Sequence, residues 1–138
     1  MNAAQSGHTV PEQEREAERR LRAVPARLNA DPVHARRAWL LDADILIGIG
    51  GTGRILPVRA GRLGEIEPAS RLMRPWAFAV RADAATWIQH WQDPPPPGWH
   101  DILALSKRGQ LTIEGNLVAF MQHLQFVKDV LAAPRMVG

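Results

Sequence analysis

The glycine-rich segment 50–53 lies between two runs of branched aliphatic residues, and it constrains the fold more than any other feature. The runs 44–49 and 54–59 have the composition of β-strands. A short glycine-rich connection between two such runs is typical of a hairpin, because glycine adopts the backbone angles that tight turns need. Pro57 places the second strand at an edge or a bulge, since proline has no backbone N–H to donate. The centre of the chain therefore predicts antiparallel strands joined by a turn.

Helical patterns precede and follow this hairpin. Asp83, Asp101 and Asn116 each stand directly before an apolar run and are typical helix N-caps. The clearest pattern follows Asn116, where apolar residues recur every three or four positions. The predicted helices span 11–23, 33–39, 84–92, 102–108 and 117–132, and further strands span 62–67, 76–82 and 111–113. This order predicts an α+β fold, in which an about five-stranded, mainly antiparallel sheet is covered by helices on one face.

The length of the chain, 138 residues without an internal repeat, fits a single domain. We expect an N-terminal tail and helix at 1–30 and an α+β domain at 31–138. The helix 11–23 has early glutamates and late arginines, an order that suits the helix dipole. Its apolar stripe is thin and ends near Leu21 and Val24, which predicts a mostly solvated helix that lies on the domain.

Charge and composition exclude several classes of partner and chemistry. The isoelectric point is about 10.5, yet the net charge is only +3 and no basic patch is interleaved with aromatic residues, so no nucleic acid is expected. The absence of cysteine excludes disulfides, thiolate catalysis and cysteine-ligated zinc. No apolar run is long enough for an integral membrane segment, and the first residues lack the apolar core of a signal peptide. We therefore expect a cytoplasmic protein.

The segment 48–53 matches the G-x-G-x-x-G fingerprint of dinucleotide-binding proteins. In that motif the last glycine opens a helix whose N-terminus holds the pyrophosphate. Here Arg54 and Pro57 stand in the segment that follows, which is a poor helix start. We therefore interpret the segment as the hairpin turn and expect no cofactor. We also expect no metal, because none of the five histidines pairs with another at metal-ligand spacing.

Residues suited to acid–base chemistry are few. His100 and Asp101 are adjacent at a predicted helix start, and His123 stands beside the apolar stripe of the last helix. Each could act as an acid or a base in a pocket, although Asp101 is also the expected helix cap. No serine stands in a nucleophile motif. A small enzyme that uses these residues therefore stays an alternative to a protein without catalysis.

Large apolar side chains are abundant for so small a sheet. They stand on the predicted strand 76–82, where Trp76 and Phe78 share a face, and on the helices 84–92 and 117–132. Composition alone leaves open whether they fill an ordinary core or surround a cavity that holds an apolar molecule. If a cavity forms, its ligand-binding residues are Trp76, Phe78, Trp87, Ile88, Trp91, Leu103, Phe120, Met121 and Leu124.

The segment 101–116, together with the apolar helix that follows it, resembles a known family. It contains the pattern G-x-L-x-I-x-G-[ND], which is formed by Gly109, Leu111, Ile113, Gly115 and Asn116. This pattern is similar to that of the sterol carrier protein type 2 (nonspecific lipid-transfer) family, and the resemblance covers residues 40–133. It implies an α+β domain with a lipid-binding tunnel between sheet and helices. It also implies binding of sterols, fatty acyl chains and other apolar molecules, mostly without catalysis.

We therefore predict a noncatalytic carrier that binds an apolar small molecule, such as a lipid, a sterol or an acyl chain, in a cavity between sheet and helices. The alternative is a small cavity enzyme, a hydrolase or an isomerase, that uses a pocket histidine or aspartate on an apolar substrate. An interaction module that uses helix 11–23 or the prolines 94–97 is a third hypothesis. The oligomeric state, a homodimer included, stays open.

Overall fold

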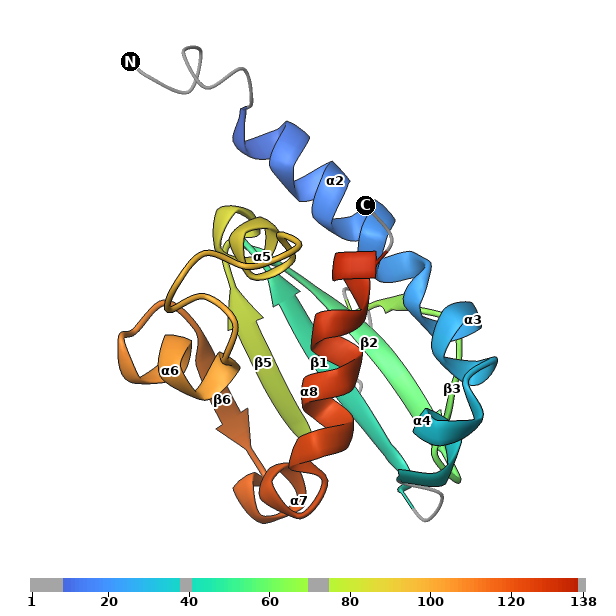
Figure 1. The fold of residues 1–138 in the computed structure, drawn as a ribbon. Coiled ribbons are helices and arrows are strands. Elements are labelled where there is room, and N and C mark those ends of the chain that lie inside the picture. Colours follow the sequence, from blue (N-terminus) through green and yellow to red (C-terminus); the bar gives the residue numbers. More distant parts are fainter. Residues whose placement is uncertain (1–8, 38–40, 70–74, 137–138) are drawn as a thin grey trace.

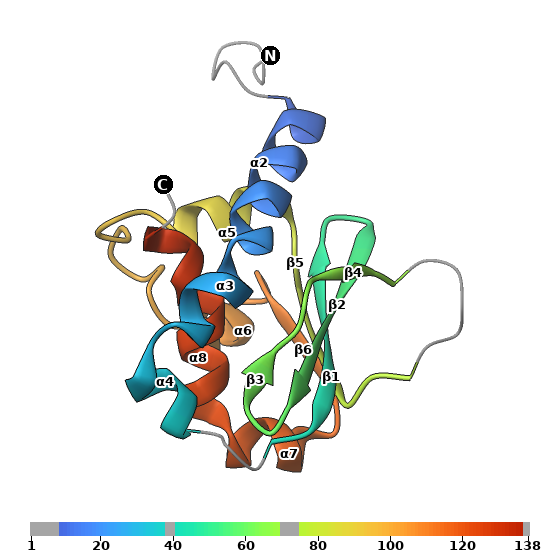
Figure 2. The same cartoon turned by 90° about the vertical axis from the view of Figure 1, so that its right-hand side faces the viewer.

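A computed structural model describes residues 9–37, 41–69 and 75–136. A sheet forms one layer and helices form the other (Figure 1). Figure 2, which views the sheet on its edge, shows the described helices on one side of it. The prediction of an α+β fold with helices on one face of a sheet is therefore confirmed.

The strands of the sheet are β1 (Ala43–Ile49), β2 (Thr52–Arg59), β3 (Arg62–Leu63), β4 (Glu67–Pro68), β5 (Phe78–Ala82) and β6 (Thr112–Gly115). Their order across the sheet is β3-β2-β1-β5-β6, and β4 pairs with β2. β1 and β5 run parallel, whereas the other described pairs are antiparallel. The sheet is thus mainly antiparallel, as predicted.

The predicted strand 62–67 is interrupted, and the interruption lies opposite Pro57. β3 pairs with residues 58–59 of β2 and β4 pairs with residues 54–55, on either side of this proline. The Pro57 carbonyl accepts a hydrogen bond from the backbone N–H of Gly64 at 2.8 Å, but Pro57 has no N–H to return. The ladder therefore breaks at this point, and the strand becomes two short ones.

The central strand β1 pairs with β2 on one edge and with β5 on the other. Its face toward the helices buries Ile45, Ile47 and Ile49, which accounts for its nearly continuous apolar sequence. The chain turns into β2 at Gly50, whose φ of +60° lies in the region that favours glycine. The segment 48–53 is therefore the predicted hairpin, because a strand and not a helix follows it.

The helices are α2 (Val10–Arg22), α3 (Val24–Asn29), α4 (Pro32–Arg37), α5 (Ala84–His90), α6 (Ile102–Lys107), α7 (Leu117–Gln122) and α8 (Leu124–Ala132), and a 3-10 turn (Ala133–Met136) follows. The predicted caps are confirmed, because side-chain oxygens of Asp83, Asp101 and Asn116 accept backbone hydrogen bonds in the first turns of α5, α6 and α7. Residues 38–39 of the predicted helix 33–39 lie outside the described part of the chain.

The predicted helix 117–132 is two helices, which corrects the prediction. His123 leaves the helical backbone angles, with φ −117° and ψ 29°. A straight helix would carry Phe120, Met121 and Leu124 on one buried face. After the break, the buried residues are Phe126, Val127, Val130 and Leu131. The change of direction thus rotates the apolar stripe and leaves Met121 exposed.

Two tryptophans, Trp87 in α5 and Trp91 directly after it, organise the core between sheet and helices. Trp87 and Trp91 stack with 5.5 Å between ring centroids. Nε1 of Trp87 donates to the Gly48 carbonyl at 2.9 Å, and Nε1 of Trp91 donates to the Leu131 carbonyl at 2.7 Å. Both indoles are buried, and each has its polar atom satisfied. α5 is therefore fixed to the sheet on one side and to α8 on the other.

Helix α2 is attached to the same core by a narrow stripe. Ala17 and Leu21 are fully buried and belong to the apolar cluster that the sheet and α8 share. Glu18, also on α2, accepts a hydrogen bond from Arg54 on β2 at 2.6 Å. Most other α2 residues are at least partly exposed, so the helix lies on the domain, as predicted. The expected division of the chain at residue 30 stays a prediction.

Candidate functional site

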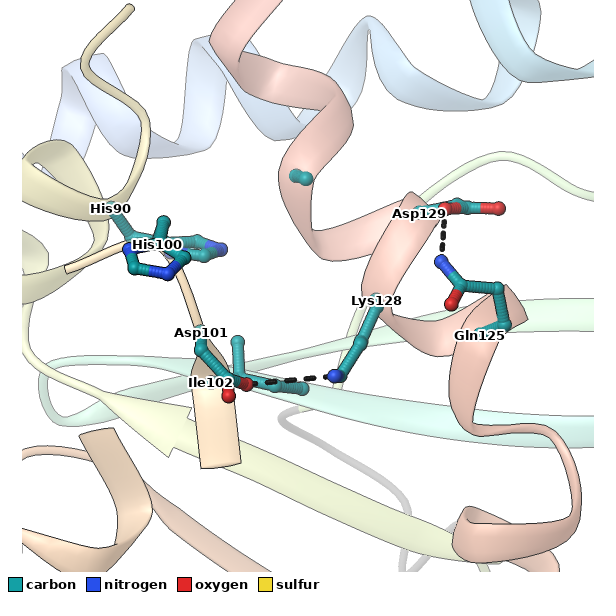
Figure 3. Close-up of a pocket in the computed structure, with 8 residues that line it drawn as sticks. His90, His100, Asp101, Ile102, Gln125, Lys128 and Asp129 are labelled. Atoms are coloured by element: carbon teal, nitrogen blue, oxygen red, sulfur yellow. Dashed lines mark hydrogen bonds and ion pairs between the residues drawn. The ribbon is translucent and has the colours of Figure 1, made fainter. Parts of the chain in front are cut away.

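A polar pocket opens between the end of α5, the loop that leads to α6, and α8 (Figure 3). Its volume of about 280 Å³ is near the lower end of the range for ligand sites. We call it the His90 pocket. Its lining residues are His90, His100, Asp101, Ile102, Gln125, Lys128, Asp129 and Ala132.

The His90 side chain is almost completely buried, with 1% of its surface exposed. Its Nδ1 lies 2.7 Å from the carbonyl oxygen of Trp99. Because a carbonyl can only accept, Nδ1 carries the proton and donates it, which leaves Nε2 as an acceptor in the neutral ring. Nε2 has no hydrogen-bond partner among the described residues. A buried polar atom without a hydrogen-bond partner destabilises a protein by about 1–3 kcal/mol, so a hydrogen bond from a bound donor to this nitrogen would be favourable.

The surroundings of His90 keep its ring neutral. Burial lowers the pKa of His90, because a charged imidazolium would lose its hydration. The hydrogen bond to the Trp99 carbonyl acts in the opposite direction, whereas the positive charge of Arg135 lowers the pKa further. Nη2 of Arg135 also donates to the backbone carbonyl of His90 at 2.6 Å, which holds the end of α5 in place. At neutral pH the ring is therefore an uncharged acceptor in a fixed position.

Charged groups form the opposite wall of the pocket. Oδ1 of Asp101 caps α6 by accepting from the Leu103 N–H at 2.9 Å, and it lies 3.6 Å from Nζ of Lys128. Figure 3 shows Lys128 reaching from α8 across the pocket toward Asp101. Gln125 donates to Asp129 at 2.9 Å and points away from His90 in the same view. The pocket thus combines a neutral acceptor with one lysine and two carboxylates, of which Asp101 pairs with the lysine.

This arrangement limits the chemistry of the pocket. Within residues 9–37, 41–69 and 75–136, no group of three or more histidine, aspartate or glutamate side chains is arranged to hold a metal ion. The lining includes no serine, and the chain has no cysteine, so a serine or cysteine nucleophile is absent from the described walls. His90 could accept a proton from water or from a bound hydroxyl group, and Lys128 could donate a hydrogen bond.

The residues expected to act as acid or base are only partly brought together. His100 and Asp101 line the His90 pocket, as a pocket enzyme would require. His123 lies at the junction of α7 and α8 and does not line it. The sequence analysis missed His90, Lys128 and their pocket. Only the packing of α8 against the loop after α5 reveals them, and no short motif in the sequence encodes that contact.

The predicted ligand-binding residues occupy three kinds of environment. The buried ones share the apolar core between sheet and helices: Phe78, Trp87, Trp91 and Phe120. Leu103 and Leu124 pack against this core and are partly exposed. Phe78 and Phe120 meet edge to face, with 5.5 Å between ring centroids. The structure therefore brings six of the nine residues together, and their role in binding stays a prediction.

The other three residues lie at the surface or on the far side of the sheet. Trp76 packs with Leu46 and Ala79 on the face away from the helices, so the prediction that it shares a face with Phe78 is wrong. β5 begins only at Phe78, and the strict alternation of a strand does not extend back to Trp76. The remaining two are Ile88, in a surface groove beside α2, and Met121, which is 55% exposed.

The exposed side of α7 is apolar. Leu117, Val118 and Met121 are 52%, 67% and 55% exposed, although all three are large hydrophobic residues. Phe120 is the one buried residue of this helix, all of which the structure describes. α7 therefore contacts the core through a single large side chain while it presents an apolar surface to the outside. None of the described helices has the length and apolar character needed to cross a membrane.

Comparisons with known proteins identify the fold. No protein-family model matches the sequence, and no curated protein matches it. Among solved structures, a protein from Thermus thermophilus described as a possible sterol carrier protein has a TM-score of 0.66 at 18% identity, covering 88% of this chain and 87% of its own. A crystal structure of sterol carrier protein 2 has a TM-score of 0.66 at 17% identity, covering 85% of this chain and 94% of its own.

A third solved structure, the ubiquinone synthesis protein UbiJ-SCP2, has a TM-score of 0.55 at 16% identity and covers 82% of this chain and 85% of its own. These identities are low, so the similarity concerns the arrangement of the backbone. It extends over the sheet and most of the helices, because more than four fifths of both chains align in each case. The chain therefore has the fold of sterol carrier protein 2.

Proposed function

We propose that this protein is a noncatalytic carrier that binds an apolar small molecule, such as a lipid, a sterol or an acyl chain, between the sheet and the helices. The similarity to sterol carrier protein 2 supports the general class of function. The observation that carries the proposal is the attachment of α7, whose one buried side chain is Phe120, with the small, partly buried Ala119 packed beside the core. The site proposed here lies where Phe120 now packs against Phe78.

An apolar ligand needs space in the core to bind, and an outward movement of α7 would provide it. It has six residues, and it is separated from α8 by the backbone break at His123. An isolated helix of this length has little stability of its own, so its position depends on tertiary contacts. When α7 moves outward, Phe120 leaves the core and an apolar ligand takes its place against Phe78. Met121 and Leu124 then border the ligand from the helical side, and Trp87 and Trp91 lie deeper in the same core.

The exposed apolar side chains of α7 fit this route. Leu117, Val118 and Met121 are exposed on the same short helix that carries the buried Phe120. An acyl chain that approaches from water can be partly desolvated on them before it reaches the interior. The same side chains give α7 an apolar surface that a ligand can cover, which compensates for the loss of the Phe120 contact.

Binding of a fluorescent fatty acid, 12-NBD-stearate, tests the proposal. Met121→Ser changes an exposed residue, so the stability should stay within about 0.5 kcal/mol of the parent. In the complex, however, Met121 is covered by the ligand, and its loss should weaken binding about tenfold. The matched control is Val10→Ser on α2, where the parent residue is 59% exposed and far from α7 (Figure 1). Failure of the parent to bind the probe, or equal affinities of the two variants, would refute the carrier.

A small cavity enzyme is the second candidate, and the neutral His90 next to His100 and Asp101 favours it. In this reading His90 takes a proton from water that attacks an ester or thioester of an apolar acid. The test is hydrolysis of p-nitrophenyl butyrate by the parent and by His90→Asn. Turnover that disappears in His90→Asn would support a hydrolase, whereas equal slow hydrolysis by both would eliminate His90 as its base.

A further inference from the structure

The His90 pocket lies beside the apolar core to which the carrier function is assigned, and Ile102 borders both. Its walls come from the carboxyl end of α5, the loop before α6, and residues 125–132 of α8. α7 joins the amino end of α8 (Figure 1), and no residue of α7 is among those that line the pocket. The polar groups of the pocket take no part in the proposed loading of an apolar ligand.

The hydrogen-bonding groups of this pocket specify what it can hold. Nε2 of His90 can only accept a hydrogen bond, because Nδ1 carries the proton that is donated to Trp99. Nζ of Lys128 can only donate, and at 3.6 Å from Asp101 it is within ion-pair range but beyond a normal hydrogen bond. A hydroxyl group is both donor and acceptor, so a single hydroxyl can satisfy both side chains.

We propose that the His90 pocket binds a small molecule through a hydroxyl group, which donates to Nε2 of His90 and accepts from Lys128. The buried Ile102 and the partly exposed Ala132 on the pocket wall receive the carbon skeleton of the ligand. The volume of about 280 Å³ exceeds the ~30 Å³ share of one water molecule, so the pocket has room for a small alcohol, whose carbon skeleton also covers the apolar part of the wall. An alcohol is therefore the class of ligand that this pocket selects.

Other ligand classes fit less well. A carboxylate or phosphate ester would bring negative oxygens against the lone pair of His90 and the carboxylate of Asp101. A metal ion lacks a third ligand, since the described residues contain no suitable group. An ether matches Lys128 but has no proton for His90, and this difference allows the proposal to be tested.

The experiment compares benzyl alcohol with benzyl methyl ether, which lacks the donor. Nitrogen-15 NMR of the histidine rings reports binding, because a hydrogen bond accepted by Nε2 shifts its resonance. The parent should bind benzyl alcohol about two- to tenfold more tightly than the ether, the factor expected for one net hydrogen bond. The His90 Nε2 resonance should shift with the alcohol only.

Three variants separate the hydrogen bond from other causes of the preference. His90→Asn keeps an amide donor near the Trp99 carbonyl but removes Nε2, so the preference for the alcohol should disappear. Lys128→Met, at a side chain that is 34% exposed, should weaken alcohol and ether alike and preserve the preference. Gln89→Ala, at an exposed position one residue away, should change neither affinity.

The affinities and the NMR shifts test the hydroxyl site, and the carrier function is tested separately. A preference that persists in His90→Asn would arise from the extra methyl group of the ether and would overturn the hydroxyl site. Equal affinities in the parent, or no shift of the His90 resonance up to saturating alcohol, would overturn it as well. His90→Asn is expected to bind 12-NBD-stearate like the parent, so a failure of either proposal is recognised separately.

Discussion

Truncation of Phe120 examines the contact on which the carrier proposal depends. The side chain is 2% exposed, and its ring meets Phe78 edge to face at 82° with 5.5 Å between centroids. Phe120→Ala should lower the unfolding free energy by about 3–5 kcal/mol, the usual cost of a Phe-to-Ala cavity. An edge-to-face aromatic pair accounts for about 0.5–1.5 kcal/mol of this. Val118→Ala on the same helix, at a 67% exposed residue, should cost within about 0.5 kcal/mol.

Two measurements follow from this variant. Urea denaturation, monitored by tryptophan fluorescence, gives the stability of Phe120→Ala and of Val118→Ala. Stopped-flow mixing with 12-NBD-stearate gives the loading rate, which should reach a plateau in the parent because outward movement of α7 precedes binding. Phe120→Ala should raise that plateau, since it removes the contact that holds α7 closed. A loss below about 1 kcal/mol, or rates that rise linearly with probe and are equal in both proteins, would contradict the reasoning.

Two further predictions concern charged groups. Burial depresses the pKa of His90 below its ordinary value of 6.5. As the pH decreases below 6.5, this histidine is protonated in the unfolded chain but stays neutral in the folded protein, so the unfolding free energy should fall. Denaturation at several pH values should show a smaller fall for His90→Asn than for the parent. The hydrogen bond from Arg54 lowers the pKa of Glu18, so this pair stabilises the protein above pH 4.5 and its contribution is lost as the pH falls through the lower folded pKa. Glu18→Gln should cost about 1 kcal/mol at neutral pH, against almost nothing for Glu16→Gln in an exposed pair on the same helix.

The parts of the fold that local patterns encode are predictable from the sequence. The hairpin at Gly50 and the caps at Asp83, Asp101 and Asn116 depend on residues a few positions apart, and the structure confirms them. The break at His123 is different, since the apolar spacing continues through it. Packing decides there, because Phe120 of α7 and Phe126 of α8 are both buried, although their spacing of six positions does not place them on one face of a straight helix.

The candidate site depends even more on contacts between residues that are distant in the sequence. Phe78 and Phe120 are predictable as neighbours, because each stands on the apolar face of a strand or helix. His90 and Lys128 are separated by a proline-rich loop, α6, β6 and α7, and no periodicity relates them. The prediction for Trp76 is wrong for a related reason. It assumes that the strand already includes Trp76, so that Trp76 and Phe78 alternate on one face, but β5 begins only at Phe78.

A core in which Phe120 fills the space beside Phe78 is compatible with a carrier if a ligand replaces the Phe120 side chain when α7 moves outward. Removal of Phe120 from the core costs at most the contacts that its truncation would lose, about 3–5 kcal/mol. Burial of a methylene group contributes about 0.8 kcal/mol, so about four to six methylenes offset that cost. Longer acyl chains then bind with a net gain, while shorter ones cannot displace the ring. In the proposed carrier, the contact between Phe78 and Phe120 would therefore act as a threshold, which keeps the empty protein closed and selects for long apolar ligands over small ones.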